Sequence, residues 1–169
     1  PMKKLYLFLC SLLACLVLFT SCGSPSQDMA KESDHQAQSI QTSLNHTSIL
    51  VEEDQAYTDK DHVAAYIHQY GHLPPNYITK KDAQALGWKD KGSLDKIAPG
   101  KSIGGDRFGN YQEQLPHKEG RTWKEADIDY IKGNRNGKRL IYSNDGLVYY
   151  TDDHYKTFKE IPWELYKYK

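Results

Sequence analysis

Four residues in the last third of the chain could together do chemistry on a phosphate ester: Glu125, Arg135, Arg139 and His154. A carboxylate and an imidazole can share the two proton transfers of a phosphodiester cleavage, one as the base and one as the acid. Two guanidinium groups can hold the phosphate and the negative charge that builds on it. The set therefore fits metal-free cleavage of a phosphodiester. The residue types alone do not establish it, because Glu, Arg and His are common on protein surfaces.

Five runs of sequence place these residues in a wider pattern. In chain order they are LPPNYITKKDAQALGW, LDKIAPGKSIGGDRFGN, GRTWKEADIDY, KRLIYSNDGLVYY and TDDHYKTF. Through these runs, the stretch from about residue 61 to residue 161 resembles the bacterial guanyl-specific ribonucleases of the barnase and binase type. The resemblance implies an endoribonuclease that cleaves single-stranded RNA 3′ to guanine by metal-free transesterification, through a 2′,3′-cyclic phosphate and without a cofactor.

The resemblance gives three residues a place at the scissile bond. It implies that Glu125 is the base, that His154 is the acid, and that Lys80 lies near the scissile phosphate. Taken by themselves, the residues leave other interpretations open. Glu125 could be an exposed strand carboxylate, His154 a solvated loop histidine, and Lys80 a solvated lysine in the first turn of a helix.

Arg135 and Arg139 match the phosphate-binding arginines of the family, a role that suits the planar fork of a guanidinium. Both could instead pair with Asp127 or Asp129, and for Arg139 the two roles can coexist. Tyr155 matches a residue that stacks beside the bound base in the family. Core packing is the other interpretation of that tyrosine.

The loop expected to select the base departs from the family pattern. Residues 109–112 match the guanine-reading loop, and Asn110 is retained. Tyr111 stands where the family has an arginine, and Gln112 stands where it has a glutamate, with Glu113 next to it. Guanine offers two donors, which a carboxylate can meet with two acceptors and an amide with only one. The candidate base-binding residues are Asn110, Tyr111, Gln112 and Glu113. Gln112 predicts a narrower preference for guanine than a glutamate would give.

Gln112 also keeps a second function open, a catalytically weak domain that uses the same groove to bind RNA or a protein inhibitor. Glu125 and His154 favour the enzyme. The resemblance allows a small acidic inhibitor of the barstar type as a partner besides single-stranded RNA, and we expect a monomer. The other histidines lack the spacing of a zinc site. Asp152 and Asp153 are interpreted as a solvated loop pair rather than a cation site.

Residues 1–22 resemble a bacterial signal peptide with a lipobox-like end. Lys3 and Lys4 precede an apolar run over residues 5–19, which is short for a membrane span. Small residues precede Cys22, and the matching cysteine of a lipoprotein is lipidated after cleavage. Phe19 departs from the aliphatic residue usual there. We expect an extracellular protein anchored to the cell membrane by lipid on Cys22 rather than by a transmembrane helix, with simple secretion as the alternative.

Composition divides the rest of the chain. Residues 23–54 are polar and lack aromatic residues, which predicts a flexible tether. Residues 55–161 form the ribonuclease-like domain, and residues 162–169 extend beyond the resemblance, where aromatic side chains could pack on the domain or stay mobile. All three cysteines precede residue 23, so the domain can form no internal disulfide. Residues 55–169 carry 19 Lys and Arg against 16 Asp and Glu, a net charge of +3 that suits a small polyanion site.

Hydrophobic spacing predicts helices first and strands after. Helices are expected over residues 58–70, with Thr58 and Asp61 as a capping box and Gly71 as the stop, over 79–86, and as a short turn over 93–98. Strands are expected over residues 125–130, 139–143 and 147–151, with a turn at residues 144–146. This order predicts an α+β domain whose N-terminal helices pack on one face of a twisted antiparallel sheet and leave the other face for a substrate.

Overall fold

The computed structural model describes residues 48–166, and the first helix in this range is α1 (Lys60–Tyr70). Its N-cap is Asp59, whose carboxylate accepts the backbone N–H of His62 at 3.1 Å. The predicted capping box of Thr58 and Asp61 is therefore wrong, and the helix begins two residues later. Gly71 ends it as predicted: with φ of 76°, its N–H donates to the Ile67 carbonyl.

Two shorter helical segments follow close to their predicted places. Thr79 caps α2 (Lys80–Ala85) by accepting the backbone N–H of Asp82 at 3.1 Å. The third is a single 3-10 turn, η1 (Leu94–Lys96). The two pack with β2 around a small apolar core that includes Ala83, Leu94 and Ile103. They hold Lys80 in the first turn of α2, beside the sheet.

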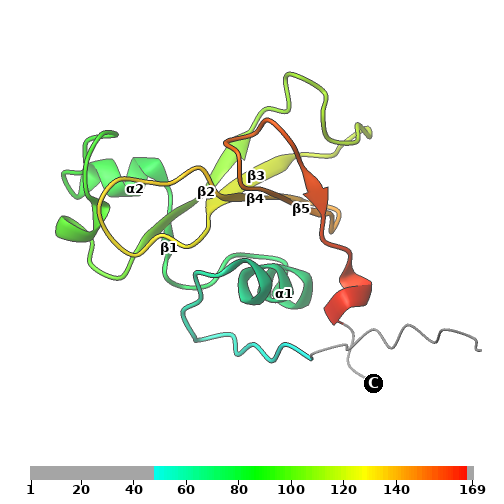
Figure 1. Cartoon of the computed structure of the whole chain (residues 1–169), viewed down its shortest axis with the longest axis horizontal. Helices are drawn as coiled ribbons and strands as arrows, with labels where there is room; N and C mark the ends of the chain where they lie inside the picture. The colour runs from blue at the N-terminus through cyan, green and yellow to red at the C-terminus, as the bar shows by residue number, and fades with distance from the viewer. Residues whose placement is uncertain (1–47, 167–169) are drawn as a thin grey trace, which may run out of the picture. The chain divides into compact units, whose positions relative to one another are not determined.

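Six strands form one sheet in chain order, and Figure 1 shows them above α1. The first two, β1 (Tyr77–Ile78) and β2 (Ser102–Phe108), are parallel, and all later neighbours are antiparallel. The others are β3 (Trp123–Asp127), β4 (Arg139–Ser143), β5 (Val148–Thr151) and β6 (Lys159–Glu160). The α+β fold class is confirmed.

The strand predicted over residues 125–130 corresponds to β3, which begins two residues earlier and ends three residues earlier than predicted. It stops at Asp127, and Asp129 has φ of 57°, a left-handed conformation that cannot continue a strand. The strands over 139–143 and 147–151 are confirmed to within one residue. Three strands were not predicted, and β2 is the one that matters for the site.

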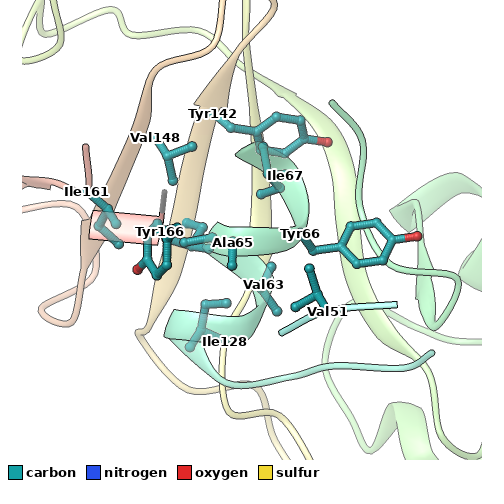
Figure 2. Packing of buried hydrophobic residues seen from close by; sticks show 12 residues of the cluster. Val51, Val63, Ala65, Tyr66, Ile67, Ile128, Tyr142, Val148, Ile161 and Tyr166 are labelled. Carbon is teal, nitrogen blue, oxygen red and sulfur yellow. The ribbon is translucent and has the colours of Figure 1, made fainter. Parts of the chain in front are cut away.

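The main core lies between α1 and the sheet. Val63 and Ile67 of α1 pack with Leu140, Tyr142 and Val148 of β4 and β5 (Figure 2). Because side chains alternate along a strand, the residues of β4 between these point to the opposite face. That face, which α1 does not cover, carries Glu125 and Asp127 of β3 and Arg139 of β4.

Both ends of the described chain pack on the helix side. Val51 is 7% exposed and lies in the main core, so the packed region includes residues that composition assigns to the tether. The C-terminal extension forms η2 (Trp163–Tyr166), and Tyr166 is only 4% exposed, so this part packs rather than staying mobile. Tyr168, Cys22, the signal segment and most of the tether lie outside the described residues. Between residues 48 and 166, no helix has the length and apolar character needed to cross a membrane.

Candidate active site

A pocket of about 510 Å³ opens on the sheet face that α1 leaves uncovered. It brings together residues from α2, β2, β3, β4 and three loops. All five predicted catalytic residues and the predicted base neighbour line it: Lys80, Glu125, Arg135, Arg139, His154 and Tyr155. Residues 109–112 of the predicted base loop line it as well, together with Arg107, Phe108 and Gln114, which were not predicted.

Glu125 lies in the middle of β3 and is 7% exposed, so the interpretation as an exposed strand carboxylate is wrong. Each of its oxygens accepts one hydrogen bond. Lys80 Nζ donates to Oε1 at 3.0 Å, and the Tyr155 hydroxyl donates to Oε2 at 2.6 Å. A buried polar group is costly without such partners, and here both carboxylate oxygens have one. The residue proposed as the base is therefore held in a fixed orientation.

Lys80 reaches Glu125 because the start of α2 is fixed to the sheet. Its backbone N–H donates to Asp106 Oδ2 at 2.9 Å, across from β2. Its side chain is 38% exposed and ends within the pocket, 3.0 Å from Glu125 Oε1. The interpretation as a fully solvated lysine is therefore wrong. One ammonium group is placed to contact both the carboxylate and an incoming phosphate.

The two arginines share one buried acid. Asp127, 2% exposed, accepts Arg135 Nε and Nη2, both at 2.6 Å. Arg139 Nε lies 3.0 Å from Asp127 Oδ1 but is not aligned for a hydrogen bond, so this contact is a charge pair. Arg139 Nη1 donates to the Asn136 and Lys138 carbonyls, each at 2.7 Å.

Pairing with an acid and lining the pocket thus coexist for both arginines, and Asp129 pairs with Lys138 instead. Burial lowers the pKa of Arg135, but the hydrogen bonds and charge of Asp127 outweigh it, so the net pKa is raised. The acid keeps the fork charged and fixed in orientation. A phosphate in the pocket would meet guanidinium groups whose positions are already set.

His154 lies in the loop after β5 and is exposed to solvent at the pocket. Its backbone is left-handed, with φ of 59°, and its N–H donates to the Gly137 carbonyl at 3.2 Å. Among the described residues, no side chain or carbonyl hydrogen-bonds its ring, which lies 5.2 Å from the ring of Tyr155. An imidazole with both nitrogens open suits exchange of a proton with a substrate.

Tyr155 is held more tightly than the sequence suggests. Its ring stacks on Phe108, with centroids 5.6 Å apart and planes at 23°, and its hydroxyl bonds to Glu125. Burial and then Glu125 raise its pKa well above the usual value, so the hydroxyl keeps its proton. The sequence indicated a residue beside the base and missed this donor role, because the partner lies 30 residues away on another strand.

The base loop is closed by Asn110, which lies at φ of 48°. Its side-chain amide donates to the Leu115 carbonyl at 2.9 Å and accepts the Leu115 N–H at 3.0 Å. Asn110 therefore shapes the loop, and Tyr111 and Gln112 are the side chains left at the pocket. Tyr111 is 94% exposed. Glu113 is not among the residues that line the pocket.

The pocket is rich in cationic groups. Lys80, Arg107, Arg135 and Arg139 line it, against the single carboxylate of Glu125. Such a set favours an anionic ligand with a hydroxyl or other proton donor near Glu125. Within residues 48–166, no group of three or more His, Cys, Asp or Glu side chains is placed to hold a metal ion.

Comparison with known proteins gives one consistent result. A family model described as ribonuclease matches residues 60–162. A ribonuclease of Heyndrickxia coagulans is 58% identical over 102 residues, which are 60% of this chain and 94% of that protein. Ribonucleases of Bacillus intermedius and Bacillus pumilus are also 58% identical over 102 residues, and the match spans 63% of the length of each. With its pocket of Glu125, His154 and two paired arginines, this chain belongs to the ribonuclease family.

Proposed function

We propose that this protein cleaves single-stranded RNA by metal-free transesterification and prefers guanine on the 5′ side of the cut. The observation that carries the proposal is the pocket itself. A buried carboxylate, Glu125, and a solvent-open imidazole, His154, line one cavity together with Lys80, Arg135 and Arg139. That set can supply a base, an acid and a clamp for the phosphate.

The reaction follows from these groups. Glu125 removes the proton of the 2′-hydroxyl, and the freed oxygen attacks the adjacent phosphorus. His154, protonated at the start, gives its proton to the departing 5′ oxygen as that P–O bond breaks. The products are a 2′,3′-cyclic phosphate and a free 5′-hydroxyl, and the proton now on Glu125 balances the one that His154 lost. DNA lacks the nucleophile, so only RNA reacts.

The cations act on the charge that builds on phosphorus. Arg135 and Arg139 are fixed by Asp127 before substrate arrives, which reduces the reorganisation needed in the transition state. Lys80 can exchange part of its contact with Glu125 for a phosphate oxygen, since its ammonium carries three donors. The Tyr155 hydroxyl keeps Glu125 oriented during that exchange.

The guanine preference rests on the base loop. Asn110 closes the loop so that its backbone amides can face a base, and Gln112 stands at the pocket in place of the expected glutamate. An amide meets one of the two guanine donors and leaves the other unmet. The preference should therefore hold but be narrower than that of a glutamate-bearing relative.

We also propose an extracellular location, with a lipid on Cys22 as the membrane anchor. The charged n-region, the apolar run over residues 5–19 and the small residues before Cys22 support it. The protein would act as a monomer. A small acidic inhibitor protein would fit the cationic pocket and is the second partner that we propose besides single-stranded RNA.

Glu125→Ala and His154→Ala test the proposed reaction. Each should lower the rate on an RNA dinucleotide by roughly 10²–10⁴-fold, the usual contribution of a positioned acid or base, and a chelator should not affect the wild-type protein. Circular dichroism shows whether each variant is folded. A folded His154→Ala variant with near-normal activity would rule out the assignment. A wild-type protein that binds RNA without cutting it would instead indicate the catalytically weak binding domain.

A further inference from the structure

The loop that carries His154 has an unusual backbone. His154 and Tyr155 are consecutive and both left-handed, with φ of 59° and 69°. Residues with a Cβ rarely adopt this conformation, and it persists only where the surrounding structure enforces it. Histidine is one of the non-glycine residues found more often in this conformation, but tyrosine is not, so residue type alone does not explain two such residues in a row. Some neighbouring group must hold the two residues in place.

Asp153 is that group. Its Oδ1 accepts the Thr151 hydroxyl at 2.9 Å and the backbone N–H groups of Lys156 and Thr157, each at 3.0 Å. Its Oδ2 accepts the Thr157 hydroxyl at 2.7 Å. One carboxylate therefore receives four hydrogen bonds and joins the residues just before His154 to the residues just after Tyr155. Asp153, interpreted above as one of a solvated loop pair, remains partly exposed but is hydrogen-bonded within its own loop.

The network continues into the site. Thr151 Oγ1, which donates to Asp153, accepts the Tyr155 backbone N–H at 3.1 Å. Together with the bond from His154 N–H to the Gly137 carbonyl, it fixes both ends of the left-handed pair. The Thr157 hydroxyl and then the Thr157 N–H lower the pKa of Asp153 to about 2, so the carboxylate is charged wherever the protein is folded near neutral pH.

We propose that Asp153 is a positioning residue for general-acid catalysis: by holding the loop of residues 151–157 it aims the His154 imidazole at the departing 5′ oxygen. This rests on the proposed function, in which His154 is the acid. Asp153 touches neither the substrate nor the reacting atoms, and acts only through where it places His154. Misplacing a catalytic group by about 1 Å can lower a rate about 10²-fold.

A change of leaving group separates positioning from a general role in folding. The 5′-hydroxyl of a nucleoside is a poor leaving group and needs a proton from His154. In guanosine 3′-(4-nitrophenyl phosphate), nitrophenolate leaves without one. A defect confined to acid placement therefore lowers the rate on a GpN dinucleotide and leaves the nitrophenyl ester rate nearly unchanged. A defect in the fold or in phosphate binding lowers both rates.

The experiment compares kcat on these two substrates for Asp153→Ala, Asp153→Asn and Asp152→Ala. Asp152 is the matched control, because it is adjacent and exposed and its replacement removes the same charge. Within residues 48–166, no hydrogen bond is made to its side chain. Asp153→Ala should lose about 10- to 100-fold on GpN and little on the ester. Asp153→Asn keeps one acceptor oxygen, so it should recover part of the loss and carries the test if the alanine variant does not fold.

Equal losses on both substrates would overturn the inference, and so would an Asp153→Ala variant with normal GpN cleavage. His154→Ala provides the reference, since it should show the same selective loss. If His154→Ala loses nothing on GpN, the proposed function fails. If His154→Ala loses selectively and the Asp153 variants do not, only the positioning role of Asp153 fails.

Discussion

The Glu125 side chain is buried, and it accepts hydrogen bonds from two donors of different kinds. Lys80 supplies a charged donor that is partly exposed, and Tyr155 supplies a neutral one packed against Phe108. The partly exposed lysine has room to turn toward a phosphate, and the tyrosine cannot move without losing its stacking. We infer that Oε1 is the oxygen that becomes available to the 2′-hydroxyl when substrate displaces the lysine.

The Gln112→Glu variant tests whether this one side chain limits the preference for guanine. A buried donor left unpaired costs roughly 1–3 kcal/mol, or about 5- to 150-fold in discrimination, so restoring the carboxylate should raise the ratio of kcat/KM for GpN over ApN. Glu113→Gln is the matched control, and its ratio should not change, because Glu113 does not line the pocket. A ratio that collapses in Glu113→Gln would show that the neighbouring carboxylate reads the base instead.

The lowered pKa of Asp153 predicts how the stability of the protein depends on pH. The pKa is about 2 in the folded protein, against about 3.9 in the unfolded chain. A lowered folded-state value means that the contribution is present above pH 4 and is lost as pH falls toward 2. Urea unfolding should therefore show a gap between wild type and Asp153→Asn that is constant above about pH 5 and closes below pH 4. A gap that is independent of pH down to 2 would contradict the charged role.

Much of the candidate site could be predicted from the sequence, because the proposed catalytic residues lie in short runs with a family resemblance. Glu125, His154 and both arginines reach one pocket as expected. The sequence could not show which groups hydrogen-bond to these side chains and fix their orientation. The Tyr155–Glu125 bond spans 30 residues, and the bonds around Asp153 exist only in one loop conformation. The sequence shows that a residue has a hydroxyl or a carboxylate, but not whether that group has a hydrogen-bond partner in the fold.

At the scale of elements, two local signals correctly predicted where a helix ends and where two strands are joined, although the capping box predicted at Thr58 and Asp61 was wrong. Gly71 ends α1, and the turn at residues 144–146 joins β4 and β5, because both depend on a few adjacent residues. β2 escaped prediction for the opposite reason. Gly104 and Gly105 interrupt its pattern, and a register shift between Gly104 and Asp106 breaks the alternation. Its pairing with β1 and β3, which are distant in sequence, makes it a strand.

The C-terminal segment η2 allows a test of how much this short element contributes. Tyr166 packs in the main core and is 4% exposed, so Tyr166→Ala should lower the free energy of unfolding by roughly 2–5 kcal/mol. Leu165, 48% exposed, is the control, and Leu165→Ala should change stability by about 0.5 kcal/mol or less. Since η2 packs on the α1 side, folded Tyr166→Ala should keep its rate on dinucleotides. Equal stability losses in the two variants would contradict the packing.

On the scale of the whole molecule, the sheet separates two tasks. One face packs on α1 and on both ends of the described chain, and it supplies the main core. The other face holds the buried Asp127 and Glu125, which it can do because every charged atom there meets a cation or a hydroxyl. With no disulfide available to the domain, the stability that tolerates these buried charges comes from packing on the α1 side.

The proposed anchor is tested on the full chain in cells. Cys22→Ser should abolish incorporation of labelled fatty acid, because the thiol is the atom that would carry the lipid. The wild-type protein should partition with membranes, and its mass should show a modified cysteine at the mature N-terminus. An unmodified mature N-terminus downstream of Cys22 in the wild-type protein would reject anchoring and leave simple secretion.

The most direct test of the proposed reaction is the identity of its first product. The purified protein is incubated with GpN in the presence of a chelator, and the products are followed with time by chromatography and mass spectrometry. We expect guanosine 2′,3′-cyclic phosphate to appear first, any guanosine 3′-phosphate to form later from it, and the 2′-deoxyguanosine analogue not to be cut. A non-cyclic phosphate as the first product, or cleavage of the deoxy analogue, would rule out transesterification by the 2′-hydroxyl.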